Sequence, residues 1–459
     1  MKTEDWIAQN KEYLIRLSDD LFQHPEQALQ EEHAAEMIAK ELAAKGFTIQ
    51  QNLGGLQTAF SATWGSGKPV IGFLGEYDAL AGMSQKPVGH KEAAHSGEPG
   101  HACGHNLLGI APLGAVLALQ ATMKEKGLPG TISYFGCPAE EIMVGKIRMA
   151  ADGCFDGLDV TLGWHPWQCN MVLKQDMLAM NTAKFTFSGI ASHAAAAPEM
   201  GRSALDAVEL MNVGANYLRE HVPANVRIHY SITNGGGEPN LVPAEAQSWY
   251  YVRALRRDVV ETVFDRICNI ARGAALMTGT NVKIELLSGC WHILPNNVLN
   301  ELLHECLQKA LLSQWSPEEK EFASQLLSGT DSNLLKRIRG QMNGQLMEND
   351  LLHEQVLPME GRQELVFGST DVSDVTWIVP TAQFGACTAP IGANCHTWQF
   401  TACAGMSIGH KGMLYAARVL ALAGLRLLEE ANIIKRAQAE FKARKGDTVY
   451  QAVTPKIIQ

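Results

Sequence analysis

PVIGFLGEYDAL, at residues 69–80, is apolar almost throughout and ends in acidic residues, and this pattern decides the fold. A strand of this composition is covered on both faces, as in a parallel sheet flanked by helices. TISYFGCPAEE (131–141) and VTLGWHP (160–166) have the same character, the first ending in acids and the second in histidine. A helix is expected over 107–125. Strands alternating with helices predict an α/β core with a mainly parallel sheet.

The rest of this core lies towards the two ends of the chain. Residues 4–45 have the pattern of two amphipathic helices broken at a His-Pro pair, because proline cannot continue a helix. AFSATWG (59–65) and VTWIVPTAQFGA (375–386) indicate further strand material, and 410–432 a long buried helix. In such sheets chemistry gathers at the carboxyl ends of the strands. The acids and histidines noted above fall at those ends.

Between residues 181 and 292 the pattern changes to a β-α-β-β-α-β unit, the split order of a small α+β sandwich. Strands are expected at 182–189, 226–234, 246–255 and 281–287, and helices around 201–220 and 258–277. The sequence therefore predicts an inserted domain, 181–292, within a discontinuous larger domain made of 1–180 and 293–459.

Composition excludes several classes of protein. The 459 residues carry a net charge of -10, whereas a nucleic-acid or anionic-membrane partner is bound through clustered Lys and Arg. No stretch approaches the ~18 uncharged apolar residues of a membrane span, and the N-terminal residues lack the apolar core of a signal peptide. The ten cysteines are scattered rather than spaced as a disulfide scaffold. We therefore expect reduced thiols in the cytoplasm, with no membrane and no nucleic-acid partner.

The strongest chemical signal is PGHACGHNLLG (99–109), in which Cys103 and His105 are two residues apart. In an extended or turning segment, side chains at this spacing can point the same way. A thiolate and an imidazole together suit zinc or another first-row divalent ion. For this motif alone, the alternative is that Cys103 is a small buried hydrophobic residue and the histidines cap the following helix.

Further candidates follow the expected strands. Glu140 and Glu141 come after one apolar strand, and His165 ends the next. Adjacent surface glutamates are common, but here one carboxylate should enter the interior, where it is costly without a cation or donor. His396, in GANCHTWQF, is another candidate. Cys395 lies beside it, and local spacing does not choose between the two.

Seven blocks carry a resemblance that runs along nearly the whole chain: GEYDALAG (75–82), PGHACGHNLLG (99–109), GCPAEE (136–141), WHP (164–166), GIASHAAAAPEMGRSALDAVELM (189–211), GSTDVSDVTWIVPT (368–381) and HTWQFTACAGMSIGHKGML (396–414). In this order they resemble the aminoacylase–carboxypeptidase family of dimetal peptidases. Within it the chain is most similar to the branch with the B subunit of p-aminobenzoyl-glutamate hydrolase and the indole-acetyl-amino-acid hydrolases.

The resemblance implies two divalent ions per subunit, zinc or manganese, held by Cys103, His105, Glu141, His165 and His396. It implies that Glu140 is the general base. A divalent ion lowers the pKa of its water to about 7, and a carboxylate that holds no metal can accept the proton.

The chain departs from the wider family at two positions. Glu76-Tyr77-Asp78 stands where many members have His-x-Asp, so the usual first histidine ligand is missing. The Cys103/His105 pair is expected to replace it, with Asp78 as an orienting group. Asn106 stands where the plant-hormone type has aspartate, which favours the aminobenzoyl-glutamate type.

The inserted domain resembles the family's lid and dimerisation domain. The resemblance implies that His193 reaches the neighbouring subunit's site and stabilises the oxyanion. Asn240 and Arg253 resemble positions that bind the substrate carboxylate, Arg through its bidentate fork. Ser369 and Thr370 are candidates to line the substrate pocket. The expected assembly is a homodimer, with a homologous A-type subunit as a further possibility.

The expected activity is metal-dependent hydrolysis of the amide bond of an N-acyl amino acid, a small molecule like p-aminobenzoyl-glutamate. One alternative is a non-catalytic or partner-dependent subunit, whose mark would be a lost base or ligand; none is lost here. Another is a cysteine amidase with Cys103 as nucleophile and His105 or His101 as base. Residues two apart rarely give that geometry, and Glu140 and His165 would then have no role. A purely structural zinc site is disfavoured by ligands that are far apart in sequence.

Overall fold

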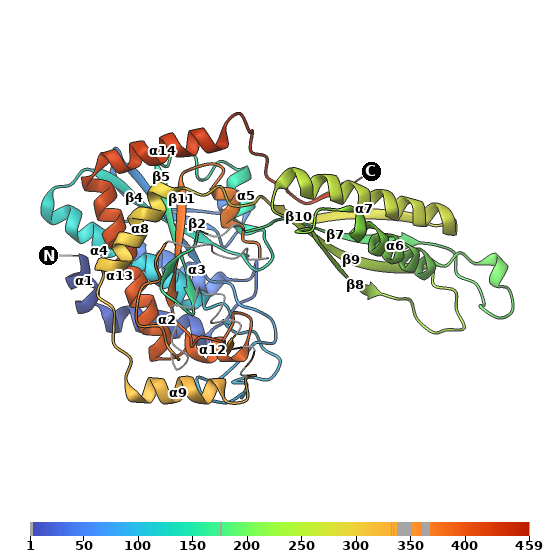
Figure 1. Ribbon diagram of the computed structural model, residues 1–459, viewed down its shortest axis with the longest axis horizontal. Helices are drawn as coiled ribbons and strands as arrows, with labels where there is room; N and C mark the ends of the chain where they lie inside the picture. The colour runs from blue at the N-terminus through green and yellow to red at the C-terminus, as the bar shows by residue number, and fades with distance from the viewer. Residues whose placement is uncertain are drawn as a thin grey trace. The chain divides into compact units, whose positions relative to one another are not determined.

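The computed structural model describes residues 3–174, 177–331, 333, 335, 336, 351–359 and 368–458. The chain forms two compact units, drawn in Figure 1. The larger unit consists of residues 1–175, 294–365 and 375–450, and the smaller of 176–293, 366–374 and 451–459. The short segments 366–374 and 451–459 thus pack with the smaller unit, although the sequence-based boundaries assign them to the larger one.

A seven-stranded sheet in the order β1-β2-β4-β3-β5-β11-β6 forms the centre of the larger unit. Its four middle strands run parallel: β4 (Gly130–Cys137), β3 (Val70–Glu76), β5 (Val160–Trp167) and β11 (Thr381–Cys387). Antiparallel strands complete the edges: β1 (Thr48–Gln51), β2 (Phe60–Ser66) and β6 (Met171–Val172). The α/β class is confirmed, and the parallel part is the centre of a mixed sheet.

Helices cover this sheet. The two longest, α4 (His105–Lys126) and α13 (Ser407–Glu429), pack against each other. The prediction that no stretch approaches the length of a membrane span was wrong, because helix α4 is long and apolar enough to cross a membrane. However, 94% of its most apolar window is buried, so we interpret it as a core helix. The other helices of this unit are α1 (Thr3–Gln9), α2 (Lys11–Gln23), α3 (Glu32–Ala44), α5 (Gly145–Ala151), α8 (Asn297–Lys309), α9 (Pro317–Leu327), α12 (Trp398–Ala404) and α14 (Ala431–Lys445).

The smaller unit has the split order expected from the sequence, with one added strand. Its antiparallel sheet runs β12-β10-β7-β9-β8, and two helices pack on one face of it (Figure 1). In chain order the elements are β7 (Ala179–Ser188), α6 (Ala204–Leu218), β8 (Arg227–Asn234), β9 (Glu245–Ala254), α7 (Arg257–Thr278), β10 (Asn281–Cys290) and β12 (Lys456–Ile458). Buried aromatic residues such as Phe185 and Tyr250 fill the space between sheet and helices.

Two local predictions were wrong. Residues 375–380 are not strand, because Val375 ends the short helix α11 (Val372–Val375) and β11 begins only at Thr381. A short buried apolar run has the same composition in a strand and in a buried turn, so periodicity does not separate them. The first amphipathic segment is also interrupted at Asn10, between α1 and α2.

Phe185→Ala should destabilise the smaller unit by about 3–5 kcal/mol, because it removes a large ring from a packed core. Phe185 is fully buried and its ring lies 5.4 Å from that of Tyr250. Leu276→Ala is the control, since Leu276 is 85% exposed and the change should stay within about 0.5 kcal/mol. Urea unfolding followed by tryptophan fluorescence measures both. Equal stability of the two variants would contradict this packing.

Candidate metal centre

The candidate residues of the larger unit lie where the parallel strands end. Helix α4 begins at His105, directly after Cys103 and the left-handed Gly104 (φ 74°). The others come from the loop after β4, the end of β5 and the loop after β11: Glu140, Glu141, His165 and His396. Because the carboxyl ends of parallel strands meet at one edge of a sheet, residues far apart in sequence can meet there.

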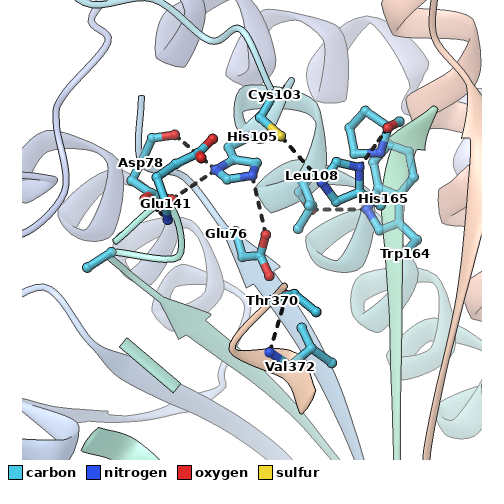
Figure 2. A network of polar contacts seen from close by, with 12 residues as sticks. Glu76, Asp78, Cys103, His105, Leu108, Glu141, Trp164, His165, Thr370 and Val372 are labelled. Atoms are coloured by element: carbon cyan, nitrogen blue, oxygen red, sulfur yellow. Dashed lines mark hydrogen bonds and ion pairs between the residues drawn. The ribbon is translucent and has the colours of Figure 1, made fainter. Parts of the chain in front are cut away.

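Donor atoms of these residues form two groups that share Cys103. One group is Cys103, His105 and His165, and the other is Cys103, Glu141 and His396; within each, the donor atoms lie within 4.8 Å of one another. The Cys103 Sγ is 3.5 Å from His165 Nε2, as Figure 2 shows. The structure thus brings together all five residues that the resemblance implies as metal ligands.

His105 is held between two carboxylates (Figure 2). Its Nδ1 lies 2.9 Å from Asp78 Oδ1, and its Nε2 lies 3.4 Å from Glu76 Oε2. Burial alone would lower the pKa of His105, but Asp78 and then Glu76 raise it well above its usual value. A carboxylate bonded to Nδ1 fixes the ring and leaves Nε2 available for a metal.

Lys146 is a part of the centre that sequence reasoning missed. It is fully buried, and its Nζ lies 2.7 Å from Glu76 Oε1. Burial would raise the pKa of Glu76, but the charges of Lys146 and His105 lower it. In the sequence Lys146 is a single lysine at the start of α5 (Gly145–Ala151), and such a residue is expected to be solvated at the surface.

Two other carboxylates hold the turn that carries Glu140 and Glu141. Glu31 Oε1 accepts a hydrogen bond from the backbone N–H of Ala139 (2.8 Å), and Asp78 Oδ2 accepts one from that of Glu141 (2.9 Å). Ala139 has a left-handed backbone with φ 56°, which is uncommon outside glycine. The backbone bonds therefore fix the direction of both glutamate side chains.

His396 also has a left-handed backbone, with φ 65°. Its N–H donates to the carbonyl of Ala102 (2.8 Å), and its Nε2 lies 3.2 Å from Glu141 Oε2. Burial would raise the pKa of Glu141, but the hydrogen bond from His396 and the charge of His105 lower it. Strained backbone of this kind is found at functional sites. His396, rather than its neighbour Cys395, belongs to a donor group.

The donor set fits divalent cations. Among the described residues, Glu76 Oε2, His105 Nε2 and Glu141 Oε1 are buried atoms without a hydrogen-bond partner. Buried polar atoms without partners cost free energy, and cations bound at His105 Nε2 and Glu141 Oε1 would compensate these two. Thiolate, imidazole and carboxylate together suit zinc, with manganese possible through the oxygen ligands.

The remaining five candidates lie in the smaller unit, and four of them form two pairs. His193 and Asn240 lie close together, because the N–H of Ala194 donates to the Asn240 carbonyl (2.9 Å). Both residues are exposed. Arg253 Nη1 donates to Ser369 Oγ (3.1 Å). Thr370 is buried, and its hydroxyl accepts from the N–H of Val372 (3.3 Å).

Comparison with known proteins places the chain in a family. The model of the peptidase dimerisation domain of M20 enzymes matches residues 180–276. The B subunit of p-aminobenzoyl-glutamate hydrolase from Escherichia coli is 39% identical, over 99% of this chain and 97% of that protein. The chain therefore belongs to the M20 family of peptidases and is a hydrolase.

Two further proteins are similar to this chain. The A subunit of the E. coli enzyme is 31% identical over 50% of this chain and 55% of its own length. A dinuclear metal-binding M20 peptidase from Bacillus subtilis has the same fold, with a TM-score of 0.60 and 17% identity over 92% of this chain and 99% of that one.

Glu31→Gln should change the pH dependence of stability. Burial, together with the charge of Asp78, raises the pKa of Glu31 from 4.5 to about 7. Its neutral form is thus favoured by folding, and the free energy of unfolding falls as pH rises from 4.5 to about 7, by about 3 kcal/mol in total. The variant should lack this fall. Denaturant unfolding across that range, with exposed Glu32→Gln as control, measures it; parallel curves for wild type and Glu31→Gln would contradict it.

Proposed function

We propose that the protein hydrolyses the amide bond of an N-acyl amino acid at a two-metal centre, with Cys103 as the ligand common to both ions. The observation that carries this proposal is the pair of donor groups sharing Cys103. His105 and His165 would complete one site, and Glu141 and His396 the other. When bound, the ions supply a water of lowered pKa and polarise the scissile carbonyl.

Glu140 is proposed as the general base. It is 7% exposed, and its donor atom lies within 4.8 Å of those of Glu76 and His105. In this role its carboxylate takes a proton from the attacking water and later gives it to the nitrogen of the leaving amine. Glu141, whose Oε2 faces His396, is assigned to the metal, so its lone pairs would hold the ion rather than accept the proton.

Residues of the smaller unit are proposed to bind the substrate. Arg253 would hold the free carboxylate of the amino-acid part by a bidentate contact, supported by Asn240, while Ser369 and Thr370 line the pocket. His193 would donate a hydrogen bond to the oxyanion in the neighbouring subunit's site, a contact of a few kcal/mol in the transition state. The exposure of His193 is compatible with a role outside its own unit.

The proposed substrate is p-aminobenzoyl-glutamate or a close relative, in the cytoplasm. The support is the 39% identity, over nearly the full length of both chains, to a subunit of the hydrolase named for that compound. Asn106 adds to it, because it stands where the indole-acetyl type has aspartate. Its amide donates to the Ala404 carbonyl (3.0 Å) and to Ser18 Oγ (3.1 Å), so it joins α4 to α2 rather than entering the centre.

The geometry disfavours Cys103 as a nucleophile. Its contact with Cys395, followed by burial, raises the pKa of the thiol well above its usual value, whereas a nucleophilic cysteine needs a lowered one. His101 is also unsuited as its base, because its Nε2 lies 3.1 Å from the Leu21 carbonyl and burial lowers its pKa to about 3.

Glu140→Gln should lower kcat for p-aminobenzoyl-glutamate by about 10²–10⁴-fold, because it removes the proton acceptor and keeps the shape. The variant should keep both metal ions, whereas Glu141→Gln should lose one of them as well as activity. Hydrolysis assays with zinc or manganese, metal analysis and a chelated sample test this together. Exposed Glu36→Gln is the control. Full activity in Glu140→Gln, or in chelated enzyme, would overturn the mechanism.

We also propose that the smaller unit mediates a homodimer. Three residues spaced along one face of α6 are exposed and apolar: Leu210, Val213 and Tyr217. Strand β8 lies at the end of the described sheet, with only β9 beside it. An exposed apolar helix face next to a free strand edge is typical of an interface in which two sheets join.

Tyr217→Glu should convert the dimer to monomers, because it places a charge on the apolar face of α6. Tyr217 is 75% exposed in the single chain. Leu311→Glu is the control, since Leu311 is 67% exposed but lies in the larger unit. Size-exclusion chromatography with light scattering gives the masses. A wild type that is monomeric alone and dimeric only with an A-type subunit would refute the homodimer.

A further inference from the structure

A group of possible metal ligands lies apart from the centre described above. Asp20, His24 and His33 each offer a donor atom within 4.8 Å of the other two. None of the three belongs to the donor groups around Cys103. They lie where α2 ends and α3 begins, both in the larger unit (Figure 1).

The three side chains converge closely. His33 Nε2 lies 2.6 Å from Asp20 Oδ2, and His24 Nδ1 lies 3.5 Å from Asp20 Oδ1. The two imidazole rings are 4.9 Å apart between centroids. His24 Nδ1 also lies 2.9 Å from the Asp20 carbonyl, and rings this close can both direct a nitrogen at one cation.

The backbone around the group is held in place. The Glu26 carboxylate accepts hydrogen bonds from the N–H groups of His33 (2.9 Å) and Ala34 (3.0 Å). The Glu26 carbonyl accepts one from Ala79 (2.7 Å). His33 is thus positioned at the first turn of α3 without help from a ligand. A preorganised donor loses less entropy when it binds.

The local field also favours a cation. His24 caps the carboxyl end of α2, whose last turn has no basic residue. The carbonyl groups at that end carry partial negative charge, which stabilises a nearby cation. Asp20 adds a full negative charge, and its side chain is 38% exposed.

We propose that Asp20, His24 and His33 form a third metal site, for Zn²⁺, distinct from the two-metal centre. Two imidazoles and one carboxylate are a common zinc set, and three protein ligands leave a position for water. The exposure of His24 (56%) and His33 (44%) means that the ion would exchange with solvent.

The expected effect of this ion is structural. It joins the end of α2 to the start of α3, and α2 in turn supports the loop before α4. The Leu21 carbonyl lies 3.1 Å from His101 Nε2, and Ser18 Oγ accepts from Asn106 (3.1 Å). Zinc at the site should therefore raise the melting temperature of the protein without being required for hydrolysis.

The test uses the full-length enzyme with its two-metal centre already loaded. Zn²⁺ is titrated by calorimetry, and bound zinc is counted after desalting. The wild type should take up one additional equivalent and gain melting temperature. His33→Ala and His24→Ala should each bind this equivalent at least about tenfold more weakly, a loss of about 1.4 kcal/mol, and gain no melting temperature. His221→Ala, at an exposed histidine of the smaller unit, should behave as the wild type.

Loading the site with Cu²⁺ gives a second readout that does not depend on stability. Nitrogen hyperfine coupling from two imidazoles should appear in the electron paramagnetic resonance spectrum of the wild type, and from one imidazole in either variant. The proposal is overturned if the wild type takes up no additional zinc. It is also overturned if the His24 and His33 variants bind zinc as tightly as the wild type. In that case His33 and Asp20 form only a hydrogen-bonded pair, and His24 only caps α2.

Discussion

The interaction on which the rest of the centre depends is the burial of His105 between Asp78 and Glu76. Its imidazole has no exposed surface, and the two carboxylates have almost none. Burying such charges costs several kcal/mol unless each is paired and hydrogen-bonded. Lys146 Nζ pairs with Oε1 of Glu76, which leaves Oε2 of Glu76 directed at His105. The end of β3, the start of α4 and the start of α5 therefore have one arrangement that satisfies these charges.

Asp78 extends the same constraint to the turn that carries Glu140 and Glu141. One of its oxygens faces the imidazole of His105, and the other accepts the N–H of Glu141. A single buried carboxylate thus positions a proposed metal ligand from α4 and the pair of glutamates after β4. Glu31 holds the other side of that turn through Ala139. Carboxyl side chains that accept hydrogen bonds from backbone N–H groups can fix a turn with a left-handed residue.

The sequence predicted the elements well where a pattern is local. Buried parallel strands are apolar and end in polar residues, so β3, β4 and β5 and the candidates after them were found within a few residues of their observed ends. Lys146 was missed because its pairing with Glu76 spans 70 residues of sequence and leaves no periodic signal. Strand β12 was missed for the same reason, since it pairs with β10 far upstream. Residues 375–380 misled because a buried turn is as apolar as a strand.

Glu140 and Glu141 show why the roles of site residues need both the sequence and the fold. Their adjacency in sequence says nothing about which would bind a metal. In the fold, the backbone bond from Glu141 to Asp78 turns its side chain towards His396, at 3.2 Å. Glu140 instead falls in a group with Glu76 and His105, where two carboxylates and one imidazole lie together. This difference in neighbours, set by one turn of backbone, supports the proposal that Glu141 is the metal ligand and Glu140 the base.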